Sequence, residues 1–221
     1  MHDEGVIKFS TEHRSCPAAR DRTGGLACAL SAWREILAQT GLVGQDPSRY
    51  DGLGFGNVSG RLGPFPGDRG RRRFLITGTQ TGGRCRLSVE DFCIVEAYDE
   101  LRNWVRSAGP VLPSSESLTH GAIYDLSPAI RFVLHGHCPV IWRQAAALRL
   151  PTTAQDVAYG TPEMAREVRR LYRSSSLPDT RILAMGGHED GVITFGSSVD
   201  DAGKTLVAAL ARAYQRICLV C

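Results

Sequence analysis

The chain has 221 residues, of which 43% are hydrophobic and 22% charged, so we expect one globular domain rather than a disordered or coiled-coil protein. The formal net charge of +3 is too small to predict a nucleic acid or an acidic membrane as a partner. Of the 26 basic residues, only Lys8 and Lys204 are lysines, which restricts a catalytic imine to two positions.

The cysteines indicate a reducing compartment, because an odd and scattered set is unlike the framework of a small secreted domain. The first fourteen residues contain no apolar run, and no stretch approaches the roughly 18 apolar residues of a membrane span. We therefore expect a soluble, cytoplasmic protein. Cys218 and Cys221 have the spacing of half a zinc site, but no second pair lies near them, so core packing or a frayed tail is the favoured interpretation.

The first half of the chain is predicted to form a helix followed by short strands. Apolar residues recur at helical spacing over 24–40, which predicts an amphipathic helix that ends near Gly41. Ser88 and Asp91 have the spacing of a capping pair for a single turn. Turn residues bound the extended segments, which we place at 52–61 (extended or turning), 73–77 and 93–97.

Helical and extended patterns alternate in the second half. Thr161 followed by Pro162 is typical of a helix start. The predicted elements are a helix beginning within 114–124, a strand at 130–137, a helix at 140–148, a helix from 161, strands at 182–185 and 192–195, and a helix from 198 that buries Tyr214 and Ile217.

These elements predict the α/β class, as a three-layer α/β/α single domain with a central mixed, mostly antiparallel sheet. We place the domain at 24–217, between an N-terminal extension at 1–23 and a C-terminal tail at 218–221.

The strongest chemical signal is His135-Gly136-His137, which lies within an apolar predicted strand. Side chains two residues apart on a strand project from the same face, so both imidazoles can reach one ion. Further ligands must come from elsewhere. The candidates are His188, in a glycine-dense turn between two apolar strands, and Glu116, in the first turn of a predicted helix.

Each of the other polar groups also has a structural interpretation. Glu116 can compensate the helix dipole, with Ser114 or Ser115 as the cap. Glu189 and Asp190 are interpreted as turn residues. His120, one turn after Glu116, either supports a metal ligand or is structural.

Two glycine-rich stretches, 54–61 and 76–83, carry asparagine, serine and threonine. Uncrowded backbone N–H groups and hydroxyls suit a phosphate or a carboxylate, although each stretch alone is also typical of a tight connection. The arginines at 71–73 are interpreted as a solvated loop edge rather than a nucleic-acid site.

The chain resembles the class II aldolase/adducin family over roughly 24–216. The resemblance rests on an ordered set of motifs, namely Gly56-Asn57-Val58-Ser59, the loop from Thr77-Gly78 to Gly83, Pro113-Ser114-Ser115-Glu116, His135-Gly136-His137 and the later His188. It implies a three-layer α/β/α domain that assembles as a fourfold-symmetric homotetramer. It also implies a divalent ion, commonly zinc (Zn2+), held by three histidines near a subunit interface.

Carried over residue by residue, His135 and His137 match the paired metal ligands and His188 the third. Glu116 matches the family's acid/base, which can also touch the metal. The phosphate-binding groups match Asn57, Ser114, Ser115 and one of two Thr-Gly steps, either Thr77-Gly78 or Thr81-Gly82. Unlike the usual His-Gly of the family, His188 is separated from Gly191 by two residues. Tyr214 is a candidate for the family's C-terminal tyrosine by position only.

The resemblance implies a metal-dependent aldolase, a lyase of carbohydrate metabolism. It would cleave or form a carbon–carbon bond in a small hydroxyketone or sugar phosphate through a metal-stabilised enediolate. Epimerisation, dehydration or decarboxylation on the same scaffold is the first alternative, and a non-catalytic adducin-like module is the second. The expected partners are a small, phosphorylated substrate and further copies of this chain, with no nucleic acid and no membrane.

Overall fold

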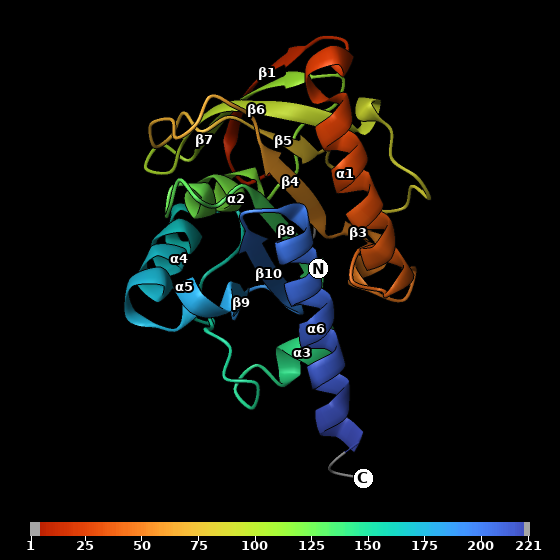
Figure 1. The fold of residues 1–221 in the computed structure, drawn as a ribbon, viewed down its shortest axis with the longest axis vertical. Coiled ribbons are helices and arrows are strands. Elements are labelled where there is room, and N and C mark those ends of the chain that lie inside the picture. The colour runs from red at the N-terminus through yellow and green to blue at the C-terminus, as the bar shows by residue number, and fades with distance from the viewer. Residues whose placement is uncertain (1–4, 219–221) are drawn as a thin grey trace.

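The computed structural model describes residues 5–218 and contains one large sheet of eight strands (Figure 1). The strands are β1 (Ser10–Ser15), β2 (Gly44–Gln45), β3 (Gly54–Phe55), β4 (Asn57–Arg61), β5 (Phe74–Thr77), β6 (Phe92–Asp99), β7 (Trp104–Gly109), β8 (Phe132–His137), β9 (Ile182–Ala184) and β10 (Gly191–Gly196). Their order in the large sheet is β1-β7-β6-β5-β4-β8-β10-β9, and β2 pairs with β3 separately. Every pairing in the large sheet is antiparallel except that of β1 with β7.

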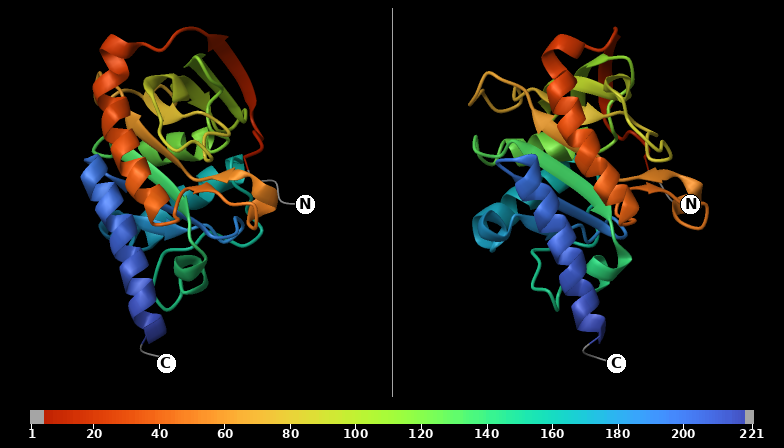
Figure 2. Two further views of the ribbon diagram at one scale, coloured as in Figure 1. Left: turned by 90° about the vertical axis from the view of Figure 1, so that its right-hand side faces the viewer. Right: turned by 45° about the vertical axis from the view of Figure 1, so that its right-hand side comes forward.

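Helices cover both faces of the sheet. They are α1 (Arg20–Gln39), α2 (Ser117–Tyr124), α3 (Pro139–Arg143), α4 (Pro162–Ser174), α5 (Leu177–Thr180) and α6 (Val199–Cys218). Helices α1, α3 and α6 lie on one face and α2 and α4 on the other (Figures 1 and 2). The predicted three-layer α/β/α domain with a mixed, mostly antiparallel sheet is therefore confirmed. None of the helices within residues 5–218 combines the length and the apolar character needed to cross a bilayer.

Each face of the sheet has its own hydrophobic core, as alternation along a strand requires. On β8, Val133 packs into the core beneath α2 and α4, whereas Leu134 packs into the core beneath α1 and α6. His135 and His137 alternate with Leu134 and therefore lie on the side of α2 and α4. This register fixes the face on which the two imidazoles meet.

Local signals in the sequence are reproduced where side chains cap the backbone. The Thr161 hydroxyl accepts a hydrogen bond from the Met164 N–H at 3.3 Å, at the start of α4. Ser88 and Asp91 form a capping box around a single 3-10 turn. Such caps depend on residues three apart, which is why they can be recognised without tertiary information.

Two predictions for the second half are wrong. The helix predicted at 140–148 ends at Arg143, and the chain then turns through Arg149, whose φ is +55°, so that Leu150 is buried. Tyr214 and Ile217 are not buried, since they are 53% and 42% exposed. The C-terminal part of α6 extends beyond the sheet (Figure 2).

Residues 10–15, within the segment predicted as an N-terminal extension, form the edge strand β1. The segment Ser-Thr-Glu-His-Arg-Ser has no apolar alternation, and its side chains are mostly exposed, so its sequence carries no strand signal. Helix α1 begins at Arg20, also inside the predicted extension. Of the predicted tail at 218–221, only Cys218 is described, as the last residue of α6, and Cys221 lies outside the described residues.

Candidate metal centre

Three histidines meet at one end of the sheet. His135 and His137 come from β8, and His188 comes from the loop between β9 and β10. One nitrogen atom from each ring lies within 4.8 Å of those of the other two, and the Nε2 atoms of His135 and His137 are 3.0 Å apart. All three side chains are buried. The predicted pair and the predicted third histidine therefore lie together, although they are about fifty residues apart in the chain.

The paired histidines lie on β8, which is hydrogen-bonded to β4 on one side and to β10 on the other. His135 lies opposite Asn57 of β4 and Ile193 of β10. Between the histidines, a Cβ atom at Gly136 would lie 2.9 Å from the Leu42 carbonyl oxygen, which accepts the His137 N–H at 2.8 Å. Glycine at 136 thus allows the chain after α1 to bond directly to the histidine strand.

The protonation of the histidines suits a metal ion. Burial lowers the pKa of His135 to about 4 and those of His137 and His188 well below the usual value, so all three are neutral near pH 7. His135 Nδ1 donates to the Val192 carbonyl at 3.2 Å, which leaves the lone pair on Nε2. Neutral imidazole nitrogens that converge in this way are a fitting donor set for a divalent ion of the zinc type.

Glu116 adds a carboxylate to the histidines. It immediately precedes α2 and is 2% exposed. Its Oε2 lies 3.9 Å from His135 Nε2, and its Oε1 lies 3.8 Å from His188 Nε2. The carboxylate therefore faces the histidines rather than capping the helix, which disfavours the helix-dipole interpretation. It is placed to touch a bound ion or to exchange a proton with a compound beside it.

His120 lies behind this set rather than in it. Its Nδ1 is 2.7 Å from the Ser59 hydroxyl, which also contacts the Tyr124 hydroxyl at 2.6 Å. Burial and the nearby His135 hold the pKa of His120 well below its usual range. His120 is therefore a buried, neutral histidine whose hydrogen bond goes to Ser59 rather than to one of the three histidines.

The two-residue insertion after His188 has a specific structural use. Asp190 is buried with φ at +63°, and its Oδ2 accepts a hydrogen bond of 2.7 Å from the Tyr50 hydroxyl. That hydroxyl also accepts one of 2.8 Å from Arg49, while the Tyr50 ring meets His137 edge-on at 4.8 Å between centroids. Asp190 is therefore more than a turn residue, because it connects the loop that carries His188 to Tyr50, whose ring packs on His137.

Sequence reasoning did not find Arg49, Tyr50 or Tyr159, whose ring centroid lies 4.4 Å from that of His188. Tyr50 and Asp190 are 140 positions apart, so no local pattern joins them. The unusual spacing between His188 and Gly191 was the one available signal that this loop differs.

The predicted anion-binding groups divide into two sets. Thr77 contacts both of the other predicted motifs: its hydroxyl accepts the Val58 N–H at 3.2 Å, and its carbonyl accepts the Ser114 N–H at 3.2 Å. The Thr77-Gly78 step therefore adjoins Asn57 and Ser114. The Asn57 Oδ1 atom is buried and accepts no hydrogen bond from residues 5–218, so it is available to a ligand.

The Thr81-Gly82 step serves the loop itself. The Thr81 hydroxyl donates to the Gly78 carbonyl at 2.9 Å, and a Cβ atom at Gly82 would lie 2.3 Å from the Gly44 oxygen. This glycine is packed against the neighbouring backbone. Gly78 is also closely packed, because a Cβ atom there would lie 2.5 Å from the Val111 side chain. It is the contact of Thr77 with the segments of Asn57 and Ser114 that favours Thr77-Gly78 as the anion-binding step, with the buried Ser115 next to Ser114.

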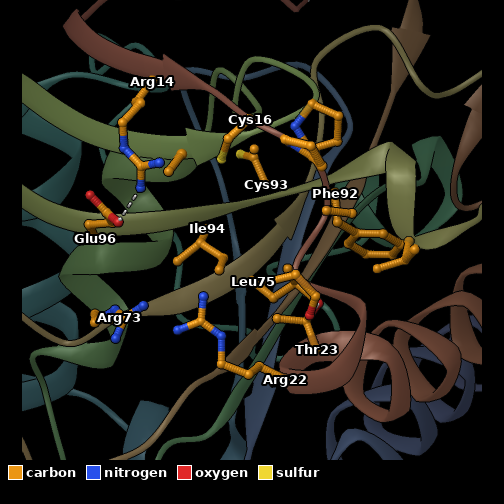
Figure 3. A pocket seen from close by; sticks show the side chains of 17 residues that line it. Arg14, Cys16, Arg22, Thr23, Arg73, Leu75, Phe92, Cys93, Ile94 and Glu96 are labelled. Carbon is orange, nitrogen blue, oxygen red and sulfur yellow. Dashed lines mark hydrogen bonds and ion pairs between the residues drawn. The ribbon is translucent and has the colours of Figure 1, made fainter.

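A separate cavity of about 210 Å³ lies between β1, the start of α1 and strands β5 to β7. Figure 3 shows Arg14, Arg22 and Arg73 around an apolar floor, with Arg14 paired to Glu96 at 3.5 Å. Within the described chain, none of the three histidines or Glu116 lines it. The cavity is therefore distinct from the candidate metal centre, which is recognised by its chemistry rather than by its volume.

Comparison with solved structures gives the same architecture. L-fuculose-1-phosphate aldolase from Thermus thermophilus matches with a TM-score of 0.60 and 22% identity, covering 88% of this chain and 95% of that chain. A sugar-phosphate aldolase from Thermotoga maritima matches with a TM-score of 0.60 and 17% identity, over 91% and 95% of the two chains. YgbL from Escherichia coli, to which an aldolase, epimerase or decarboxylase activity is attributed, matches with 0.64 and 15%, over 88% and 89%. At these identities the likeness shows the fold alone.

The comparison with curated proteins gave no match. The family profile described as Class II Aldolase and Adducin N-terminal domain matches residues 46–216, which is most of the chain and includes every candidate ligand. The resemblance read from the sequence motifs is thereby confirmed, and the chain belongs to the class II aldolase and adducin N-terminal domain family.

Proposed function

We propose that this protein is a metal-dependent lyase that cleaves or forms a carbon–carbon bond in a small hydroxyketone or sugar phosphate. The observation that carries the proposal is the convergence of three buried, neutral histidines with the Glu116 carboxylate. His135, His137 and His188 would hold the ion, which we propose to be zinc. When bound, the ion supplies a positive charge that stabilises negative charge developing on substrate oxygens.

The protein groups have separate tasks in this proposal. Glu116 moves the proton, because its carboxylate lies beside two of the ligands and is shielded from water. Asn57, Ser114, Ser115 and the Thr77-Gly78 step bind the anionic end of the substrate. A buried network that includes Tyr50 and Asp190 holds the ligands in place. From the family resemblance we also propose a homotetramer, a cytoplasmic location and a role in carbohydrate metabolism.

A second reaction on the same scaffold is supported by the similarity to YgbL, because its attributed activities include epimerisation and decarboxylation. Dehydration belongs to the same group. The protein framework does not distinguish these reactions, since they differ in which proton donor meets the substrate. A non-catalytic adducin-like module is disfavoured, because burying three histidines and a carboxylate costs stability that an inert domain has no reason to lose.

The test is product analysis with the zinc-loaded protein on a panel of phosphorylated hydroxyketones. Release of an aldehyde together with a two- or three-carbon fragment is expected. Carbon dioxide or an isomer as the sole product would contradict the lyase and support the second candidate. Glu116→Gln should keep its zinc and lose about 10²- to 10⁴-fold in kcat, and full turnover by this variant would refute the proton-transfer role.

A further inference from the structure

The N-terminal segment Gly5–Phe9 lies outside the residues matched by the family profile, yet it reaches the candidate metal centre. It runs from β1 toward the β2–β3 hairpin (Figure 2, left). Its Val6 N–H donates to the Tyr159 hydroxyl at 3.2 Å, and the same hydroxyl donates to the Val6 carbonyl at 3.3 Å. Tyr159 is the residue whose ring packs on His188, so the segment is joined to a metal ligand through a single side chain.

Further contacts hold the segment on both sides of Val6. The Thr79 hydroxyl donates to the Gly5 carbonyl at 3.4 Å, which connects the segment to the predicted anion loop at 77–83. Phe9 is buried in the core beneath α2 and α4. The Asn103 side chain donates to the Lys8 carbonyl at 2.7 Å, which fixes the backbone at Lys8. The segment therefore bridges the anion loop and the histidines as an ordered part of the fold.

The ammonium group of Lys8 lies over the ring of Tyr159. Its Nζ atom lies 4.0 Å from the centroid of the Tyr159 ring, which in turn packs on His188. An ammonium is a compact charge with three N–H donors, so it can contact an aromatic face and an anion at the same time.

The positive charge of the Lys8 ammonium favours an anionic ligand. A divalent ion held by three neutral imidazoles keeps its positive charge, so a second cation near His188 raises the positive potential there. Glu116 contributes one negative charge beside the ligands. A substrate anion between the ammonium and the anion loop lowers the electrostatic energy of both cations.

We propose that Lys8 binds the anionic group of the substrate, a phosphate or a carboxylate, and that the segment 5–9 is part of the substrate-binding site. This inference deepens the proposed function and rests on it for the identity of the site. Lys8 acts with the Thr77-Gly78 step and selects small anionic compounds over neutral ones of the same length.

The test is isothermal titration of the zinc-loaded, full-length protein with orthophosphate, glycolate and phosphoglycolate. Lys8→Met should weaken the binding of phosphoglycolate about tenfold or more, as expected for the loss of one charge-assisted hydrogen bond. Lys8→Arg should restore most of the affinity. Lys204→Met is the matched control, because the other lysine lies exposed on α6 beside Asp200. A loss for orthophosphate but not glycolate assigns the phosphate to Lys8, and the reverse assigns the carboxylate.

Equal affinities of the wild type and Lys8→Met for all three anions would overturn the inference, as would the absence of binding to the wild type. Loss of zinc from Lys8→Met would also overturn it, because Lys8 would then support His188 rather than the substrate. The outcome is separable from that of the proposed function. If zinc and Lys8-dependent anion binding are found but no carbon–carbon cleavage occurs, only the lyase reaction fails.

Discussion

The histidine cluster and the arginine-lined cavity are both polar, but they differ in how their side chains are held. His135 and His137 are 0% exposed and His188 is 6% exposed, whereas the Arg14 side chain at the cavity is 66% exposed and pairs with Glu96 at 3.5 Å. Burying a polar group costs free energy, whereas an exposed arginine costs almost nothing. The comparison shows that a cluster of buried polar side chains is a better indicator of a functional site than the volume of a cavity.

The largest expected effect is at the histidines. The double variant His135→Ala, His137→Ala removes two of the three nitrogen donors, so we expect the zinc content after dialysis to fall from about one per chain to nearly zero. Activity on any substrate found in the product screen should fall to background. Elemental analysis measures the metal directly, and a double variant that keeps its zinc would show that the ion is bound elsewhere.

An intermediate effect is expected at Tyr50. Tyr50→Phe removes the donor to Asp190 while keeping the ring on His137, and supporting groups of this kind typically change metal affinity by about 10- to 100-fold. Competition with a chelator gives the affinity, and Tyr214→Phe, at an exposed tyrosine of α6, is the control. Unchanged zinc affinity with a lowered melting temperature would show that the network supports the fold and not the ion.

The smallest effect is expected at the cavity. Arg22→Ala combined with Arg73→Ala alters two of its arginines without touching the ligands, so the free energy of unfolding should change by no more than about 0.5 kcal/mol for each substitution. Zinc content should equal that of the wild type. Denaturant titration and elemental analysis check both statements, and a loss of metal would remove the distinction between the two regions.

The features that the sequence predicted directly are those determined by residues close together in the chain. The cap at Thr161, the turn at Ser88 and the pair His135-Gly136-His137 are local patterns, and the structure reproduces them. The meeting of His188 with that pair depends on long-range contacts. Its place among polar residues in a glycine-dense turn made His188 a candidate, and the family resemblance matched it to the third ligand.

The parts that escaped prediction have few local signals. Strand β1 is polar and is held by backbone pairing with β7, which hydrophobic periodicity does not detect. The length of α3 and the burial of Tyr214 and Ile217 were predicted wrongly, because burial depends on what packs against a helix and not on its own sequence pattern. Lys8 was noted only for its rarity, since nothing near it in the chain indicates that Tyr159 and His188 lie beside it.

Helix α1 is connected to the 77–83 loop and, through the chain that follows the helix, to the histidine strand β8. Arg34 donates hydrogen bonds to the carbonyls of Arg84 and Gly82, at 2.7 and 2.5 Å, at the end of the 77–83 loop and directly after it. Three residues beyond the helix, the Leu42 carbonyl accepts the His137 N–H at 2.8 Å. Because a 20-residue helix is stiff, it fixes the spacing between these two attachment points. The helix therefore holds the end of the 77–83 loop and the histidine strand at fixed positions, so that neither can shift without displacing the other.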